Sequence, residues 1–211
     1  MTPRTLARTL MLTTALMVAT PVLAQQTPAQ TTATTPTRTS TEFTLSTDLP
    51  RTPEQERLTF DKADLVIRVF PDRQAIEGVA TLDFTASDTI EWLPVELDTV
   101  FGIDRVAVNG VDLDPDDNWR NDEGRLFIDL GGARQGPGPV QVTIAYSGKP
   151  RVAPHAPWDG GFVWATAPGG EPWIATAVQP EGCDLFWPCI DNPLGEPRGV
   201  DLHITVPSNL S

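Results

Sequence analysis

The chain has 211 residues, with 28 acidic against 15 basic side chains and a formal net charge of −13. A balance this acidic repels phosphate backbones and anionic lipid surfaces, so we expect no nucleic-acid partner. With 21 prolines, 16 glycines and 40% hydrophobic residues, the composition favours a turn-rich globular fold and excludes a helix-dominated one.

Residues 1–24 have the pattern of a signal peptide. Arg4 and Arg8 form a basic start, residues 10–18 are mostly apolar, and Ala24 ends a run of the small residues that signal peptidase requires. Threonines and Pro21 interrupt the apolar stretch, which is too short to span a bilayer, so no membrane anchor is expected. We predict cleavage after Ala24 and an exported product, periplasmic or secreted.

Residues 25–53 are rich in Thr, Pro, Gln and Ser and contain few apolar side chains. Such a segment buries too little surface to offset the entropy lost on ordering. It is therefore predicted to be a disordered linker, which leaves residues 54–211 as the folded domain.

Alternating apolar and polar residues dominate that domain. Residues 65–69 and 80–84 alternate around the turn-forming segment 71–74, which predicts a β-hairpin. Further strands are expected at 95–97, 103–108, 126–130, 140–146 and 202–206. Because no segment shows a sustained helical period, we predict an all-β fold, an antiparallel β-sandwich or saddle-like sheet.

Residues 147–196 differ in composition from the preceding strands, because four of the six Trp occur there among glycines and prolines. Two interpretations are open. The segment could be an aromatic-packed loop region that covers the end of a sheet. It could equally form a surface for a ligand or a partner protein, where Trp is enriched.

The sequence offers little catalytic chemistry. The only two histidines, His155 and His203, are 48 positions apart and neither has a Glu beside it, so an HExxH zinc motif is absent. His155 is expected in a loop, and His203 on the solvent face of a strand. No Gly-x-Ser-x-Gly elbow occurs, although a Ser/His/Asp triad stays open. We therefore assign no catalytic and no metal-binding residue.

Cys183 and Cys189 are the only thiols in a chain expected to enter an oxidising compartment. They could form a disulfide that closes a small loop, or they could be two buried thiols that pack as small hydrophobes. The apolar residues between them favour buried thiols slightly. The distance between the two Cα atoms distinguishes the two possibilities, since a disulfide requires about 7 Å or less.

Residues 179–193 (QPEGCDLFWPCIDNP) carry the most distinctive motif. They resemble a segment of the N-terminal β-domain of the aminopeptidase N family of zinc metallopeptidases (peptidase family M1, the gluzincin aminopeptidases), in which a Gln or Glu precedes a Phe/Trp-Pro-Cys-x-Asp-x-Pro core. Supporting pieces follow the family's order: 77–84 (EGVATLDF), 145–150 (AYSGKP), 158–162 (WDGGF) and 201–207 (DLHITVP). The resemblance covers residues 58–211.

The resemblance implies one substrate-binding residue, Gln179, which would contact the free α-amino group of a peptide in a complete enzyme. A neutral Gln accepts a hydrogen bond from an ammonium group but adds no charge attraction. The family's second polar position, two residues earlier, is Ala177 here, a departure from the pattern.

The resemblance also implies what this chain lacks. The family's HExxH helix, distal Glu ligand and catalytic Tyr lie beyond the position of Ser211, so zinc is expected in the full-length family but no cofactor in this chain, and the chain alone should be inactive. The domain is expected to be incomplete at its C-terminal end, where the family continues with further strands. A catalytic domain on another chain is a candidate partner.

These observations favour one function, the N-terminal, cleft-lining domain of an exported zinc aminopeptidase-like protein. The alternative is a free-standing periplasmic β-module that binds a peptide or protein through its Trp-rich loops. A small hydrolase active by itself ranks third.

Overall fold

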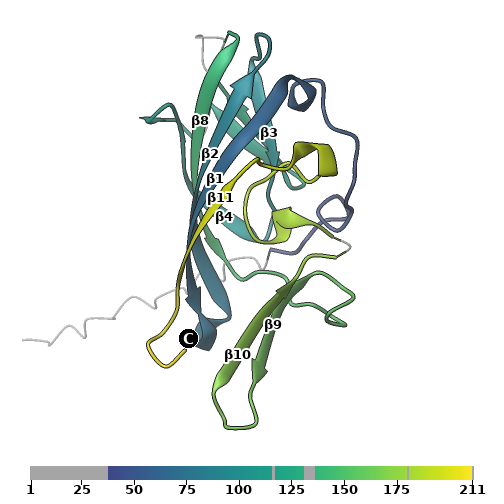
Figure 1. Ribbon diagram of the computed structural model, residues 1–211, viewed down its shortest axis with the longest axis vertical. Coiled ribbons are helices and arrows are strands. Elements are labelled where there is room, and N and C mark those ends of the chain that lie inside the picture. Colours follow the sequence, from purple (N-terminus) through teal and green to yellow (C-terminus); the bar gives the residue numbers. More distant parts are fainter. Residues whose placement is uncertain (1–37, 116, 131–135, 180, 211) are drawn as a thin grey trace, which may run out of the picture. The chain divides into compact units, whose positions relative to one another are not determined.

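The computed structural model describes residues 38–210 except 116, 131–135 and 180. The predicted signal peptide, residues 1–24, and the first part of the predicted linker, residues 25–37, lie outside the described residues. The strands are β1 (Leu58–Phe70), β2 (Ala75–Ala86), β3 (Trp92–Glu96), β4 (Phe101–Val108), β5 (Val111–Asp112), β6 (Trp119–Asp122), β7 (Arg125–Asp129), β8 (Gly138–Gly148), β9 (Gly161–Thr166), β10 (Pro172–Ala177) and β11 (Val200–Thr205) (Figure 1). Four 3₁₀ turns connect them: η1 (Gln55–Arg57), η2 (Pro71–Arg73), η3 (Cys183–Leu185) and η4 (Pro193–Gly195).

The prediction of an all-β fold built on antiparallel sheets is confirmed. The largest sheet has six strands in the order β11-β1-β2-β8-β4-β5, and its first hairpin is the predicted one. β1 and β2 pair from Phe70 and Ala75 at the turn to Leu58 and Ala86 at the far end. The turn closes because Gln74 adopts a left-handed conformation (φ 49°) after η2.

A three-stranded sheet, β3-β7-β6, supplies the other side of the core. β2, β7 and β8 alternate buried with more exposed positions, so one face of each contributes to the shared core, whereas β3 is buried along most of its length. The core between these strands includes Leu82, Phe84, Leu93, Val95, Leu126, Ile128, Val142 and Ile144, each at most 1% exposed. Within the described ranges, no helix has the length and apolar character that a bilayer crossing requires.

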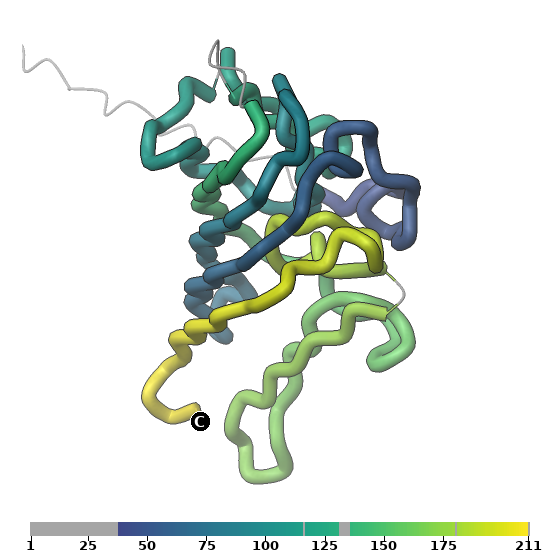
Figure 2. The backbone as a smooth tube through the Cα atoms, turned by 45° about the horizontal axis from the view of Figure 1, so that its top comes forward, coloured from purple at the N-terminus to yellow at the C-terminus, as the bar shows by residue number. Residues whose placement is uncertain are grey.

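The segment between β8 and β11 contains a hairpin that the sequence did not predict. β9 and β10 form a separate two-stranded sheet (Figures 1 and 2). Phe162 on β9 is buried and stacks on Trp164, with 5.1 Å between the ring centroids. The two strands are short and flanked by glycines and prolines, so their alternation of buried and exposed residues could not be recognised in the sequence.

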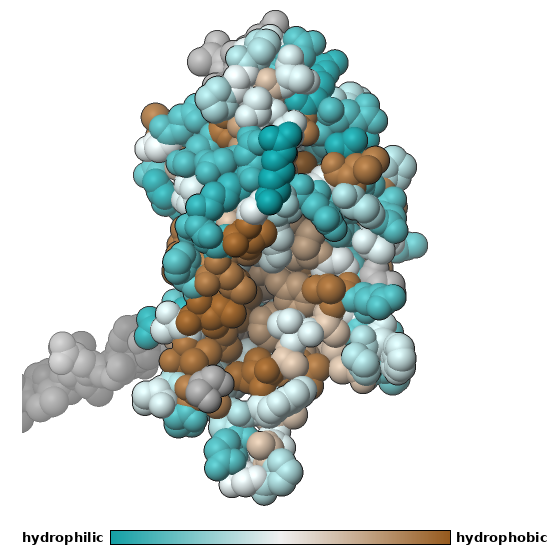
Figure 3. Space-filling model, in the orientation of Figure 1, coloured by the Kyte–Doolittle hydropathy of each residue, from teal (hydrophilic) through white to brown (hydrophobic). Residues whose placement is uncertain are grey.

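The last strand completes the large sheet in parallel with the first. β11 pairs with β1 from Ala63 and Val200 to Arg68 and Thr205, and all six of its residues are exposed. The alternation predicted a half-buried strand, but Leu202 and Ile204 are 54% and 55% exposed. With the β9–β10 hairpin they line an apolar groove of about 550 Å³, and Figure 3 shows the apolar surface gathered there.

Residues 25–53 were predicted to be a disordered linker, but residues 38–53 of this segment pack against the domain. Thr44 is fully buried, the Ser40 hydroxyl donates a hydrogen bond to Asp98 (2.6 Å), and Arg38 donates one to the backbone oxygen of Phe101 (2.7 Å). We call residues 38–53 the arm. Composition misjudged the arm because hydrogen bonds to a buried carboxylate, rather than apolar burial, hold it in place.

Candidate functional site

A groove of about 520 Å³ collects most of the distinctive motif. The arm forms one side, the turn after β10 another, and residues between η3 and the start of β11 form the rest. Its lining residues are Thr47, Asp48, Val178, Gln179, Gly182, Cys183, Trp187, Cys189, Ile190, Asp191, Asn192, Pro193, Glu196, Pro197 and Val200.

Gln179, the predicted substrate-binding residue, lies in this groove. It is exposed in the turn that follows β10, and the turn is closed by a hydrogen bond from the Gly182 N–H to the Val178 oxygen (2.7 Å). Ala177 is the last residue of β10 and pairs with Gly161 of β9. The structure therefore places Gln179 among the residues that line the groove, and the position of Ala177 carries no polar side chain.

Glu181 fixes this turn to a distant part of the chain. Its side chain is buried and receives hydrogen bonds from the Arg151 guanidinium (2.7 Å) and the Gly160 N–H. Arg151 also donates to the Gly160 oxygen, so Glu181, Arg151 and the Gly160 backbone form one hydrogen-bonded network. Sequence reasoning gave Glu181 no role, because its partners lie in another loop.

A disulfide joins Cys183 and Cys189 and lines the groove. The slight preference for two buried thiols was therefore wrong. η3 curls the segment after Cys183 so that the two Cα atoms are 6.3 Å apart, within disulfide range. Leu185 and Phe186 between them are indeed buried, but the loop that buries them also brings the cysteines together.

Three carboxylates give the groove its charge. Asp48, Asp191 and Glu196 line it, and no Lys or Arg does so among the described residues. Burial raises the pKa of Asp191 above its ordinary value, and the hydrogen bond from the Cys183 N–H opposes the shift. The groove is consequently suited to a cationic group.

The residues present do not fit a zinc site. Within the described parts of the chain, no group of three or more His, Cys, Asp or Glu side chains could hold a metal ion. His155 lies in the loop before β9 and pairs with Asp159 (2.6 Å), and His203 lies on β11 with its Nε2 3.8 Å from Asp64. Both histidines are exposed and face their own carboxylate.

Comparisons with known proteins give a likeness of structure only. No protein-family model and no curated protein matches the chain. The M1 zinc metallopeptidase of Deinococcus radiodurans is similar over 75% of this chain and 34% of its own, with 20% identity and a TM-score of 0.59. A mutant of it bound to a Tyr-Ser-Ala substrate matches at 21% identity (TM-score 0.57), covering 76% of this chain and 35% of that one. The yeast LTA4 hydrolase matches at 16% identity (TM-score 0.56), covering 75% and 25%.

These matches concern the fold, and the chain spans about a third or less of the length of the solved chains. The likeness agrees with the resemblance carried by residues 179–193. The fold of the described residues is similar to the N-terminal domain of M1 zinc metallopeptidases.

Proposed function

We propose that this chain is the N-terminal, cleft-lining domain of an exported zinc aminopeptidase-like protein, and that its groove receives the free amino terminus of a peptide. The observation that carries the proposal is the position of Gln179. Gln179 lines a groove that also has three carboxylates and, among the described residues, no cationic side chain, in a fold similar to that of M1 metallopeptidases.

The groove chemistry matches an α-ammonium group. The carbonyl oxygen of Gln179 accepts one ammonium hydrogen bond, and Asp48, Asp191 and Glu196 supply the charge attraction that a neutral amide lacks. The apolar wall formed by Val178 and Trp187 is suited to the first side chain of the peptide.

Peptide hydrolysis itself requires groups that the described residues do not provide. Zinc chemistry activates water for attack on a peptide carbonyl. We assign it to a catalytic part beyond the described residues, in the same polypeptide or on another chain. The role of this domain is then to hold the amino terminus, not to cleave the bond.

The test is binding of Tyr-Ser-Ala, the peptide bound by the similar Deinococcus mutant, to the full chain. Trp187 lines the groove, so its fluorescence reports occupancy, and calorimetry gives the affinity. We expect the N-acetylated peptide to bind about tenfold more weakly or worse, because a charged hydrogen bond contributes about 1.5–3 kcal/mol. The Gln179→Ala variant should lose affinity only for the free peptide.

Gln141→Ala is the matched control, since Gln141 is exposed on β8 and does not line the groove. Equal binding of free and acetylated peptides, or equal losses in the two variants, would overturn the proposal. Turnover of an aminoacyl anilide by the chain with added zinc alone would overturn the assignment of catalysis to another part.

The Trp-rich loops support a second candidate, a free-standing module that binds a peptide or protein. Trp158 is 77% exposed and Trp173 is 53% exposed, and exposed Trp side chains are typical of binding surfaces. A Trp173→Ala variant that loses peptide binding while Gln179→Ala keeps it would favour this candidate. The reverse result favours the cleft-lining domain.

A further inference from the structure

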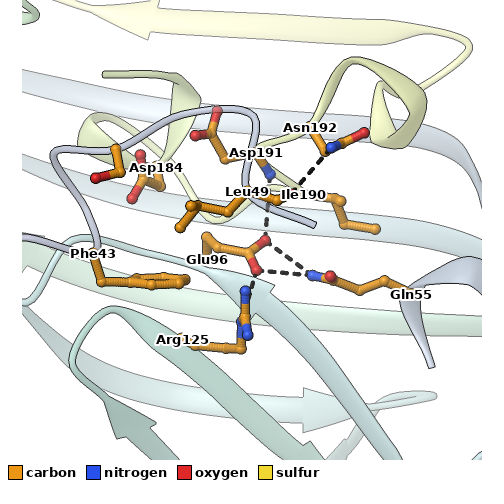
Figure 4. A pocket seen from close by; sticks show the side chains of 10 residues that line it. Phe43, Leu49, Gln55, Glu96, Arg125, Asp184, Ile190, Asp191 and Asn192 are labelled. Carbon is orange, nitrogen blue, oxygen red and sulfur yellow. Dashed lines mark hydrogen bonds and ion pairs between the residues drawn. The ribbon is translucent and has the colours of Figure 1, made fainter. Parts of the chain in front are cut away.

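A small cavity of about 10 Å³ adjoins the groove and shares Ile190, Asp191 and Asn192 with it, and acidic side chains gather in this cavity (Figure 4). Its wall includes the carboxylates of Glu96, Asp184 and Asp191 and the guanidinium of Arg125. Asp98 lies beside it, since the Asp98 N–H donates to the backbone oxygen of Asp184 (3.0 Å). Four carboxylates therefore share one buried region with a single cation from the cavity wall.

Glu96 has a full set of donors. It is only 5% exposed, and it accepts hydrogen bonds from Gln55 Nε2 (2.9 Å) and Arg125 Nε (3.0 Å) (Figure 4). The Asp191 N–H is a further donor at 3.3 Å. The charge of Arg125 is thereby matched to Glu96 and is not free to compensate another carboxylate.

Asp98 and Asp191 are also hydrogen-bonded. Asp98 is fully buried and accepts from the hydroxyls of Ser40 (2.6 Å) and Thr44 (3.3 Å). Asp191 accepts from the Cys183 N–H at 3.2 Å. Each of these carboxylates can keep its charge because donors replace water.

Asp184 differs from the other three. Its side chain is 2% exposed, and its Oδ1 atom is buried with no hydrogen-bond partner. The adjoining cavity has room for about one water molecule, and the 2% exposure of Asp184 leaves the group little contact with bulk water. An ionised Asp184 would be a buried, poorly solvated anion among three others, which is strongly unfavourable.

We propose that Asp184 is held in the folded protein as the neutral carboxylic acid, and that this proton makes segment 183–191, which lines the groove, sensitive to pH. The inference stands independently of the proposed function. Burial, followed by the charges of Asp191, Asp98 and Glu96, raises the pKa of Asp184 from 3.8 to about 9.

The direction of the pH effect follows from proton linkage. In the unfolded chain Asp184 loses its proton near its ordinary pKa of 3.8, whereas in the folded chain it keeps the proton up to about pH 9. The stabilisation from this proton is fully present below about pH 4 and is lost as the pH rises toward 9. Over that window unfolding, or any opening that exposes Asp184, becomes about tenfold more favourable per pH unit.

The groups that face Asp184 come from each neighbouring element. Glu96 is on β3, Asp98 follows β3, Arg125 is on β7 and Asp191 follows the disulfide loop. The arm and η1 contribute Phe43, Ser46, Leu49 and Gln55 to the cavity wall, none of which titrates. Asp98 and Asp191 also have raised pKa values, so the unfolding experiment compares variants in which both are retained.

The first experiment measures urea unfolding of the full chain and of Asp184→Asn from pH 5 to pH 8. Asn has the same shape and no proton to lose, so the ratio of the wild-type unfolding constant to that of the variant should rise about tenfold per pH unit. Asp72→Asn, at an exposed site in η2, is the control and should give a ratio that stays flat. A flat ratio for Asp184→Asn would overturn the proposal.

The second experiment does not depend on the variant folding. Infrared spectra of the wild-type chain at pH 7 should show the carbonyl band of a protonated carboxylic acid. Asp191→Asn removes the neighbouring charge with the largest effect and should move the disappearance of this band to lower pH. Absence of the band at pH 7, or its persistence in folded Asp184→Asn, overturns the assignment.

Discussion

The guanidinium of Arg151 lies 2.7 Å from the carboxylate of Glu181 and joins two loops that are 30 positions apart in the chain. Glu181 belongs to the turn that carries Gln179, and Arg151 follows β8. The turn is therefore anchored to the large sheet by a largely buried ion pair rather than by its own backbone alone.

Glu181→Ala should destabilise the chain by about 3 kcal/mol, because it leaves the guanidinium of Arg151 and the Gly160 N–H without their buried acceptor. Urea unfolding measures the loss. Glu171→Ala, at an exposed position before β10, is the control and should change stability by less than about 0.5 kcal/mol. Similar losses in the two variants would contradict an anchoring role.

Gly182→Ala should cost more than Gly170→Ala. Both glycines have positive φ, 104° and 96°, so each substitution carries backbone strain of about 1 kcal/mol or more. A Cβ at Gly182 would also collide with the carboxylate of Asp191, whereas a Cβ at Gly170 meets nothing within 4 Å. Thermal unfolding of the two variants compares them directly. If they lose equal stability, the close approach of the Gly182 turn to Asp191 is not rigid.

Reducing the disulfide between Cys183 and Cys189 should lower the free energy of unfolding by about 2 kcal/mol. The bridged loop is short, with a sequence separation of 6, so the entropy removed from the unfolded chain is modest. Urea unfolding with and without a phosphine reductant gives the difference. The Cys183→Ser/Cys189→Ser double variant should match the reduced chain and respond to no reductant.

Ser40→Ala should destabilise the chain by about 1.5–3 kcal/mol, because the buried Asp98 loses its 2.6 Å donor. Removing this donor should also raise the pKa of Asp98 further, because that hydrogen bond opposes the effect of burial. Ser46→Ala, whose hydroxyl donates to the exposed Glu42 backbone, is the matched control. A negligible effect of Ser40→Ala would indicate that the arm packs without this bond.

Local patterns predicted those parts of the fold whose pairing is local. The β1–β2 hairpin follows from alternation on both sides of a Pro-Asp turn, and the strand at β8 from its own alternation. β11 was found as a strand, but its parallel pairing with β1 joins residues more than 130 positions apart and leaves no local signal.

The candidate site was less accessible to sequence reasoning. Gln179 was predicted as a substrate-binding residue from the resemblance to a motif, and the structure shows that it lines a groove. The buried acids were not found, because their donors come from Ser40, Gln55 and Arg125, far away in the chain. Their burial depends on tertiary contacts, which cannot be predicted from amino-acid composition or from hydrophobic periodicity.

The parallel pairing of β1 with β11 sets an order of events during synthesis. β1 can pair with β2 as soon as the first hairpin has emerged, but its other edge stays open until residue 205 is available. An open, partly apolar strand edge favours pairing with other chains. The interval before β11 becomes available is therefore the time at which this domain is most prone to pair with other chains.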